Sequence, residues 1–141
     1  MAKKIIPKQI VCDSNVFINL LRNDKKTIAV VAEIGENNII MPVITAIELV
    51  KGTENKNELK YIVDFIMSFH SLQLNNKGIN LSLEFVKKYH LAYNLGLADA
   101  MIAASVVTAN LQLFTFNVKD FNFIKGLKLY YSPSISNIKK K

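Results

Sequence analysis

Short apolar runs alternate along the chain with longer stretches in which apolar residues recur at helical spacing. Residues 9–12 form the first run and predict a strand. The polar sequence Asp13-Ser14-Asn15 follows, and it is typical of a helix N-terminus because apolar residues come next at the spacing of one helix face: Val16, Phe17, Leu20 and Leu21. The beginning of the chain therefore predicts strand, turn and helix in that order.

The same alternation continues through the rest of the chain. Further strands are predicted at residues 38–41, 71–74, 111–116 and 128–131. Further helices are predicted at residues 27–34, 45–51, 57–70, 81–93 and 98–109, with a turn at 75–78 and Gly96 as a break between the last two helices. Strands that alternate with helices indicate an α/β fold with a central, mainly parallel sheet flanked by helices.

Length and composition narrow the class of protein. The chain has 141 residues, half of them apolar, and contains no repeat or linker, so we expect one domain over residues 1–141. No apolar run reaches the roughly 18 residues of a membrane span, and no apolar stretch near the start suits a signal peptide, so we expect a cytoplasmic protein without membrane contact. Cys12 is the single cysteine and has apolar neighbours, which excludes a disulfide framework and predicts a core residue.

The net charge of +7 is concentrated at the two ends of the chain. Two basic tails, about residues 1–8 and 139–141, hold six of the 18 basic residues, and the remaining 12 nearly balance the 11 acidic residues. Such tails can hold a phosphate backbone without recognising its sequence, or they can serve only as solubilising ends. The charge is thus compatible with a polyanionic partner but does not identify one.

Two acidic residues follow the first two predicted strands. In parallel α/β sheets, reactive groups collect just beyond the carboxyl ends of the strands. Asp13 comes directly after the first strand, where it is either a catalytic acid or the N-cap of the next helix. Glu48 lies in the helix after the second strand, where it is either part of a site or part of that helix's solvated side.

Asp99 is the most informative acid in the sequence. It is the only Asp, Glu, Lys or Arg between Lys88 and Lys119, and the predicted helix around it is apolar on all sides and so should be largely buried. An ionised carboxylate is costly there unless a helix N-terminus, a cation or a metal ion compensates it. A purely structural role in the first helical turn is the alternative.

Two polar side chains follow the strand predicted at residues 111–116. Asn117 lies nearer the strand end, and Asp120 lies three residues later. Either side chain can complete a polar pocket. The alternative is an ordinary turn in which Asp120 caps a short helix after it.

Taken together, these acids indicate a metal site with oxygen ligands. Clustered carboxylates repel one another, and a hard cation such as Mg2+ makes them tolerable as anions. Such a site activates water and neutralises charge at a phosphodiester. His70 and His90 have no second His or Cys at metal-ligand spacing, so we expect them to be surface or helix-packing residues.

Four segments resemble motifs of the PIN domain family and, within it, of the VapC-type toxins. They are VCDSNVFINLL (11–21), ITAIELVKG (44–52), LADAMIAAS (97–105) and LFTFNVKDF (113–121), they follow the order of the family, and they span most of the chain. The resemblance implies a PIN-like α/β fold and an endoribonuclease activity that depends on Mg2+ or Mn2+.

The resemblance also implies roles for individual residues. Asp13, Glu48 and Asp99 match the three acids of the family's metal site. Asn117 and Asp120 compete for the fourth acidic position, and we favour Asp120. In the implied hydrolysis, Asp13 and Asp99 hold the metal, while Glu48 and Asp120 hold or deprotonate the attacking water. Residues expected to orient the acids or the substrate are Ser14, Asn15, Thr45 and Asn117.

The resemblance finally implies partners: an RNA substrate, a cognate antitoxin whose C-terminal segment occupies the groove, and a second copy of the chain in a homodimer. One alternative is a housekeeping PIN nuclease in RNA processing or decay, which the short chain disfavours because an added RNA-binding domain has no room. Another is a non-catalytic PIN binding module, which the retention of three repelling acids disfavours. A phosphatase or phosphotransferase usually has Asp-x-Asp after the first strand, whereas this chain has Asn15 at the second Asp position.

Overall fold

Five parallel strands form the centre of the molecule. The structure is a computed structural model and describes residues 8–135. The strands are β1 (Ile10–Cys12), β2 (Ile39–Pro42), β3 (His70–Leu72), β4 (Gln112–Phe114) and β5 (Lys128–Leu129), and they pair in the order β3-β2-β1-β4-β5. Every neighbouring pair is parallel. The predicted α/β class with a mainly parallel sheet is therefore confirmed.

Six α-helices connect and cover these strands in the described part of the chain. They are α1 (Ser14–Leu21), α2 (Lys25–Ile34), α3 (Val43–Lys51), α4 (Lys56–Met67), α5 (Asn76–Tyr93) and α6 (Leu97–Thr108). Residues 8–135 also contain three short 3-10 helices: η1 (Glu36–Asn38), η2 (Val118–Asp120) and η3 (Pro133–Ile135).

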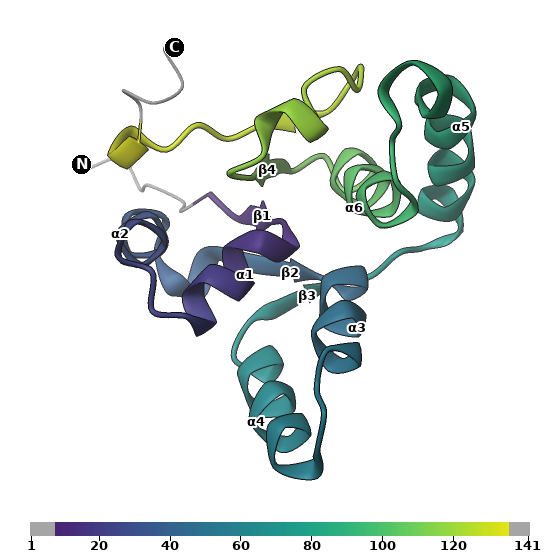
Figure 1. The fold of residues 1–141 in the computed structure, drawn as a ribbon. Coiled ribbons are helices and arrows are strands. Elements are labelled where there is room, and N and C mark those ends of the chain that lie inside the picture. The colour runs from purple at the N-terminus through teal and green to yellow at the C-terminus, as the bar shows by residue number, and fades with distance from the viewer. Residues whose placement is uncertain (1–7, 136–141) are drawn as a thin grey trace, which may run out of the picture.

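The sheet has a hydrophobic core on each face because successive side chains of a strand point to opposite sides. Val11 and Leu113 belong to the core that contains residues of α5 and α6. Cys12 and Phe114, one residue further along the same strands, belong to the core that contains residues of α1 and α2. Figure 1 shows α5 and α6 on one side of the sheet and α1 and α2 on the other.

Helix α6 is buried over most of its length, as the sequence predicts. Its buried residues are Ala100, Ile102, Ala103, Ala104, Ser105 and Val106. Gly96 is its N-cap residue, so no side-chain hydrogen bond caps the helix N-terminus. Cys12 is also buried as predicted, and burial, followed by the charge of Asp13, raises the pKa of its thiol above the usual range. The thiol therefore stays protonated and unreactive.

Most predicted boundaries differ from the structure by one or two residues, and two are wrong by three or more. Helix α5 begins at Asn76 rather than Leu81, because the side chain of Asn75 accepts a hydrogen bond from the backbone nitrogen of Gly78 at 2.9 Å and so caps the helix. The predicted turn at 75–78 is thus the first turn of α5. Helix α4 ends at Met67 instead of continuing to His70, since Phe69 leaves the helix to pack edge-on against Phe17 and the next residue begins β3.

Several smaller expectations concern the surface and the ends. None of the helices described is long and apolar enough to cross a membrane. His70 and His90 are both exposed, in agreement with the sequence. The predicted basic tails lie outside the described residues, apart from Lys8, which is exposed.

Candidate active site

The predicted acids gather at the carboxyl ends of β1 and β4. These strands are neighbours, with Cys12 in register with Phe114, and the chain continues to β2 on the other side of β1. The point at which connections leave a parallel sheet in opposite directions forms a crevice in which ligands bind. Asp13 follows β1 and Thr115 follows β4, so both side chains lie at this crevice.

Asp13 is a buried carboxylate, only 4% exposed, and both of its oxygens accept hydrogen bonds. Its Oδ1 accepts from the backbone nitrogen of Asn15 at 2.8 Å, and its Oδ2 accepts from Oγ1 of Thr115 at 2.5 Å. Burial raises the pKa of Asp13, the two hydrogen bonds oppose the rise, and the charge of Asp120 adds to it. The N-cap role considered for Asp13 is real, and the same residue is also an acid of the cluster.

Thr115 is a site residue that the sequence did not single out. Its Oγ1 accepts a hydrogen bond from the backbone nitrogen of Asn117 at 2.9 Å and donates one to Asp13. It is 3% exposed and lies directly after β4. The available signal was a lone hydroxyl in the otherwise apolar end of the predicted strand at residues 111–116. Its contact with Asp13 can be inferred only once the order of the strands in the sheet is known.

Glu48 lies on α3 and is exposed, and a hydroxyl pair connects it to α1. Its Oε1 accepts a hydrogen bond from Oγ of Ser14 at 2.7 Å. The same Ser14 oxygen lies 2.9 Å from Oγ1 of Thr45, which is fully buried. Thr45 thus holds Ser14, and Ser14 contacts the Glu48 carboxylate rather than Asp13, the acid that it was expected to orient.

Asp99 lies in the first turn of α6, close enough to the other three acids for their charges to act on it. Its pKa is raised to about 6, first by burial and then by the charges of Asp13, Asp120 and Glu48. It makes no described hydrogen bond. The fold therefore brings together four carboxylates from segments that are far apart in the sequence.

Asp120 and Asn117 lie at the opposite ends of the short stretch that follows β4. Asp120 ends the 3-10 helix η2, is exposed, and does not cap a following helix. Its charge raises the pKa of both Asp13 and Asp99. Asn117 is exposed and contributes its backbone nitrogen to Thr115. Asp120 as the fourth acid stays a prediction, supported by this electrostatic proximity.

The four acids have no cationic partner among the residues described. The ion pair that residues 8–135 contain joins Lys87 to Glu84 on α5, away from the cluster. Over the same residues, no three His, Cys, Asp or Glu side chains lie in a geometry that would hold a metal ion. The acids are thus near one another without forming a closed coordination shell. Their donors are all oxygen, which is the chemistry that Mg2+ and Mn2+ prefer.

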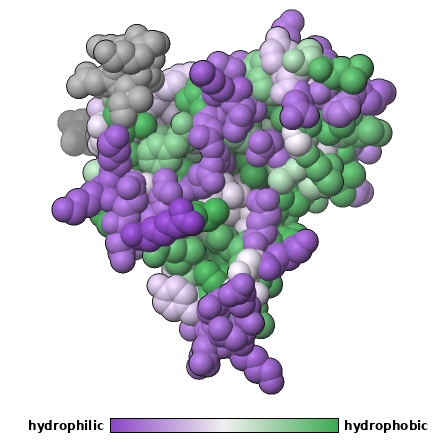
Figure 2. Space-filling view, in the orientation of Figure 1, coloured by the Kyte–Doolittle hydropathy of each residue, from purple (hydrophilic) through white to green (hydrophobic). Residues whose placement is uncertain are grey.

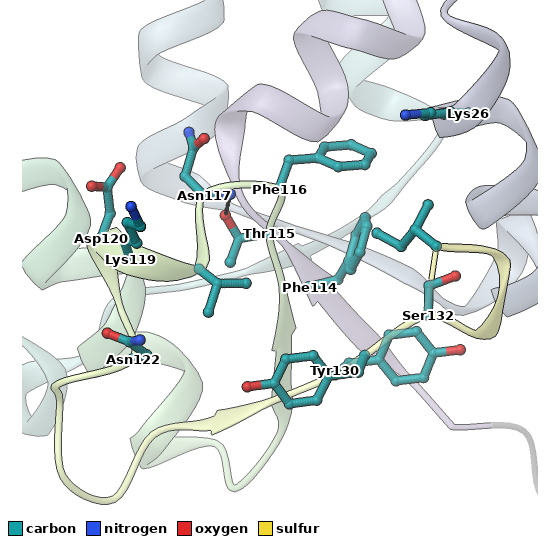
Figure 3. Close-up of a pocket in the computed structure, with 13 residues that line it drawn as sticks. Lys26, Phe114, Thr115, Phe116, Asn117, Lys119, Asp120, Asn122, Tyr130 and Ser132 are labelled. Carbon is teal, nitrogen blue, oxygen red and sulfur yellow. Dashed lines mark hydrogen bonds between the residues drawn. The ribbon is translucent and has the colours of Figure 1, made fainter. Parts of the chain in front are cut away.

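A large cavity opens beside the acids. Its volume is about 1180 Å3, and three of the residues that line it on the acid side are Thr115, Asn117 and Asp120. Figure 3 shows Asn117, Lys119 and Asp120 at one end of this cavity and Lys26 and Ser132 at the other. The acid cluster therefore borders a space that can hold a substrate much larger than a water molecule.

One family matches most of the chain. The PIN domain family matches residues 10–125. No curated protein matches the chain. Solved structures with the same fold include VapBC-1 from nontypeable Haemophilus influenzae, with 27% identity, a TM-score of 0.70 and coverage of 86% of this chain and 96% of that chain.

Two further structures are similarly related. A toxin-antitoxin complex from Klebsiella pneumoniae has 23% identity and a TM-score of 0.70, with 87% of this chain and 98% of that chain covered. VapBC2 from Rickettsia felis, bound to a DNA fragment from its promoter, has 21% identity and a TM-score of 0.71, with 86% and 96% covered.

Proposed function

The chain belongs to the PIN domain family, and from this premise we propose that it is a metal-dependent endoribonuclease that acts as the toxin of a toxin–antitoxin pair. The family match confirms the resemblance drawn from the four sequence motifs, and PIN domains are nucleases. RNA as the substrate and Mg2+ or Mn2+ as the cofactor belong to the proposal.

One observation carries the proposed chemistry: four carboxylates converge without a described cation between them. The rise in the pKa of Asp99 to about 6 measures how unfavourable the burial and the mutual repulsion are in the protein alone. A structural cluster would be expected to contain Lys or Arg. Acids that stay unpaired are instead suited to bind a divalent cation.

Asp13 and Asp99 would hold the cation, with Glu48 and Asp120 completing the set of oxygen donors. A bound divalent cation supplies a water of lowered pKa and neutralises charge on a phosphodiester. The protein contributes a fixed first ligand, because Asp13 is held on one side by the backbone of Asn15 and on the other by Thr115.

In this proposal, Glu48 accepts a proton from the attacking water. Its carboxylate is exposed, so water reaches it, and Ser14 fixes one oxygen while the other stays available. Asp120, also exposed, is the alternative acceptor. The expected products of this hydrolysis carry a 5'-phosphate and a 3'-hydroxyl.

The toxin role rests on the kind of complexes that the related structures represent and on an apolar surface near Glu48. The large exposed apolar side chains of α3 and α4 are Ile47, Val50, Leu59, Tyr61, Val63 and Met67. A groove of about 640 Å3 runs between α1, α3 and α4, and Glu48 lines it. In Figure 2, hydrophobic surface is visible above the hydrophilic tip formed where α3 connects to α4. An antitoxin segment in this groove would block Glu48. The proposal also includes that the protein forms a homodimer and acts in the cytoplasm.

The nuclease proposal is tested by incubating purified protein with total cellular RNA in Mg2+, in Mn2+ and in excess EDTA. We expect cleavage with either metal, no cleavage in EDTA, and 5'-phosphate ends on sequencing. The matched control is Glu84→Gln, which removes an exposed acid outside the cluster and should cleave normally. Undiminished cleavage in EDTA would contradict the proposed chemistry.

The toxin proposal is tested separately by induced expression. We expect growth arrest that is relieved when the product of a small neighbouring gene, encoding a DNA-binding antitoxin, is expressed with it. Arrest that no neighbouring product relieves would favour a nuclease of RNA processing or decay.

A further inference from the structure

Most of the residues that line the cavity beside the acids have no role in the hydrolysis proposed above. Its volume of about 1180 Å3 exceeds the roughly 300–1,000 Å3 of most small-molecule sites. The lining residues that concern a ligand are three aromatics, two lysines and two amides: Phe116, Tyr130, Tyr131, Lys26, Lys119, Asn117 and Asn122. The cavity is thus neither purely apolar nor purely charged.

The aromatic rings are held in place by their neighbours. Phe116 is partly exposed and packs edge-on against Phe114, with ring centroids 5.0 Å apart. Tyr130 also packs edge-on against Phe114, with ring centroids 6.2 Å apart, and its hydroxyl donates to Glu33 at 2.6 Å. Rings fixed in this way offer flat surfaces without a large loss of side-chain freedom on binding.

The lysines give the cavity a positive charge next to the negative acid cluster. Lys26 comes from α2 and Lys119 from η2, and neither forms an ion pair with a residue in the described range. Figure 3 shows Lys26 and Lys119 at opposite ends of the cavity, with Phe116 between them and Tyr130 below. An anionic chain that enters the acid cluster can therefore continue across the rings and meet a cation at each end.

We propose that this cavity is a subsite for unpaired nucleotides of the RNA next to the phosphodiester that is cut. The inference rests on the proposed nuclease function and adds how the RNA is held. Bases stack on Phe116 and the tyrosines, Asn117 and Asn122 face base edges, and Lys26 and Lys119 face phosphates. The subsite takes single strands only, because a base stacked in a duplex cannot reach the rings.

Continuity with the acids is the reason to favour RNA over a segment of a partner protein. Thr115 and Asp120 line the cavity and are also tied to Asp13, one by a hydrogen bond and one by its charge. A ligand in the cavity therefore lies beside one of the four acids, Asp120, and beside the hydroxyl that holds Asp13.

The test uses binding in EDTA, where the RNA is not cut. The probe is a short, mixed-sequence, single-stranded RNA with a 5' fluorescent label, compared with the same RNA annealed to its complement. Phe116→Leu should weaken single-strand binding about tenfold and leave duplex binding unchanged. The double variant Lys26→Gln, Lys119→Gln should lower the salt slope of single-strand binding by about 1.4, at about 0.7 per phosphate. Matched controls are Tyr93→Leu and Lys77→Gln, exposed residues outside the cavity.

A second variant keeps the test independent of any packing defect in Phe116→Leu. The chain has no tryptophan, so Phe116→Trp introduces a single fluorescent reporter. Single-stranded RNA should quench its fluorescence, because a base stacks on the indole, and its affinity should equal that of the wild type. Duplex RNA should not quench it.

The outcomes separate this inference from the proposed function. Metal-dependent cleavage by the wild type, together with unquenched tryptophan and unaltered binding in the variants, overturns the subsite and leaves the nuclease intact. Quenching by single strands without any metal-dependent cleavage supports the subsite and overturns the nuclease. Absence of both binding and cleavage overturns both.

Discussion

At the scale of single residues, the carboxyl group of Asp99 opposes folding when it is ionised. The folded protein binds a proton at Asp99 more tightly than the unfolded chain does, because its pKa is about 6 against an ordinary 3.8. The contribution of this proton to stability is therefore complete below pH 3.8 and is lost as the pH rises through 6. At pH 7 the ionised side chain opposes folding.

Asp99→Asn should accordingly stabilise the metal-free protein at pH 7. The amide has nearly the same volume and carries no charge, so the repulsion from Asp13 and Glu48 disappears. We expect a gain of about 1 kcal/mol, below the full linkage value because the side chain is partly exposed. The difference should vanish near pH 4, as measured by urea unfolding in EDTA. Reduced stability of the variant at pH 7 would show that Asp99 is a structural residue.

The same variant should lose activity and its response to metal. Mg2+ should raise the melting temperature of the wild type, since a ligand of the folded state stabilises it, and should have no such effect on Asp99→Asn. RNA cleavage should fall at least about 100-fold, as removal of an anionic ligand predicts. Near wild-type cleavage would exclude Asp99 as a ligand of a catalytic metal.

Thr115 should act through Asp13. Thr115→Val removes the hydroxyl that donates to Asp13 and accepts from Asn117, and we expect kcat to fall about 10- to 100-fold. Because that hydrogen bond lowers the pKa of Asp13, its loss should raise this pKa further and move the acidic limb of the pH–rate profile to higher pH. Thr115→Ser keeps the hydroxyl and should restore both quantities. Equal losses in the Val and Ser variants would point to packing instead.

At the scale of elements, one carboxylate fastens the end of the described chain to α2. Glu33 accepts hydrogen bonds from the hydroxyls of Tyr130, Ser132 and Ser134 at 2.6–3.0 Å and from the backbone nitrogen of Ser134 at 3.0 Å. Partial burial alone would raise the pKa of Glu33, but these hydrogen bonds lower it overall. Since Tyr130 also lines the cavity, Glu33 sets the position of one cavity wall.

Glu33→Gln should loosen this connection. We expect a loss of about 1 kcal/mol at pH 7, a modest value because the carboxylate is largely exposed. A lowered pKa means that the stabilisation is present above the ordinary value of 4.5 and is lost as the pH falls through the lower value in the folded protein. The deficit of the variant in urea unfolding should therefore shrink at low pH. Glu36→Gln, which removes an exposed acid from η1, is the control and should match the wild type at both pH values.

At the scale of the whole molecule, charge and fold serve separate purposes. The net charge of +7 comes mainly from the two ends of the sequence, whereas the acid cluster and its cavity lie in the folded body. Attraction of a polyanion by the ends depends on salt and not on sequence. Under the proposed function, we expect the described residues to select the cleavage site.

Deletion of Lys139, Lys140 and Lys141 should therefore weaken RNA binding without changing where RNA is cut. We expect the salt slope to fall by up to about two, at about 0.7 per neutralised phosphate. Binding across a salt series gives the slope, and sequencing of RNA ends gives the cleavage sites. A changed set of cleavage sites would mean that the end of the chain recognises sequence.

The sequence by itself determined the class of fold and most of the elements, and it singled out the acids as candidates for the site. Local periodicity fixes which face of a helix or strand is apolar, and the isolation of Asp99 in an apolar helix already implied a special environment. The start of α5 was missed because the same residues, Asn75 and Gly78, suit both a turn and a helix cap. Only the three-dimensional structure, in which the side chain of Asn75 accepts a hydrogen bond from the backbone nitrogen of Gly78, distinguishes between these conformations.

The tertiary structure alone decided which groups meet. Strand order cannot be read from local pattern, and the order β3-β2-β1-β4-β5 is what places Thr115, about a hundred residues away in the chain, against Asp13. The same is true of the cavity, whose walls come from α2, η2 and the residues after β4 and β5. Periodicity reports the environment of a residue, whereas chemistry depends on distances of a few ångströms between segments that only the packing of the sheet and helices sets.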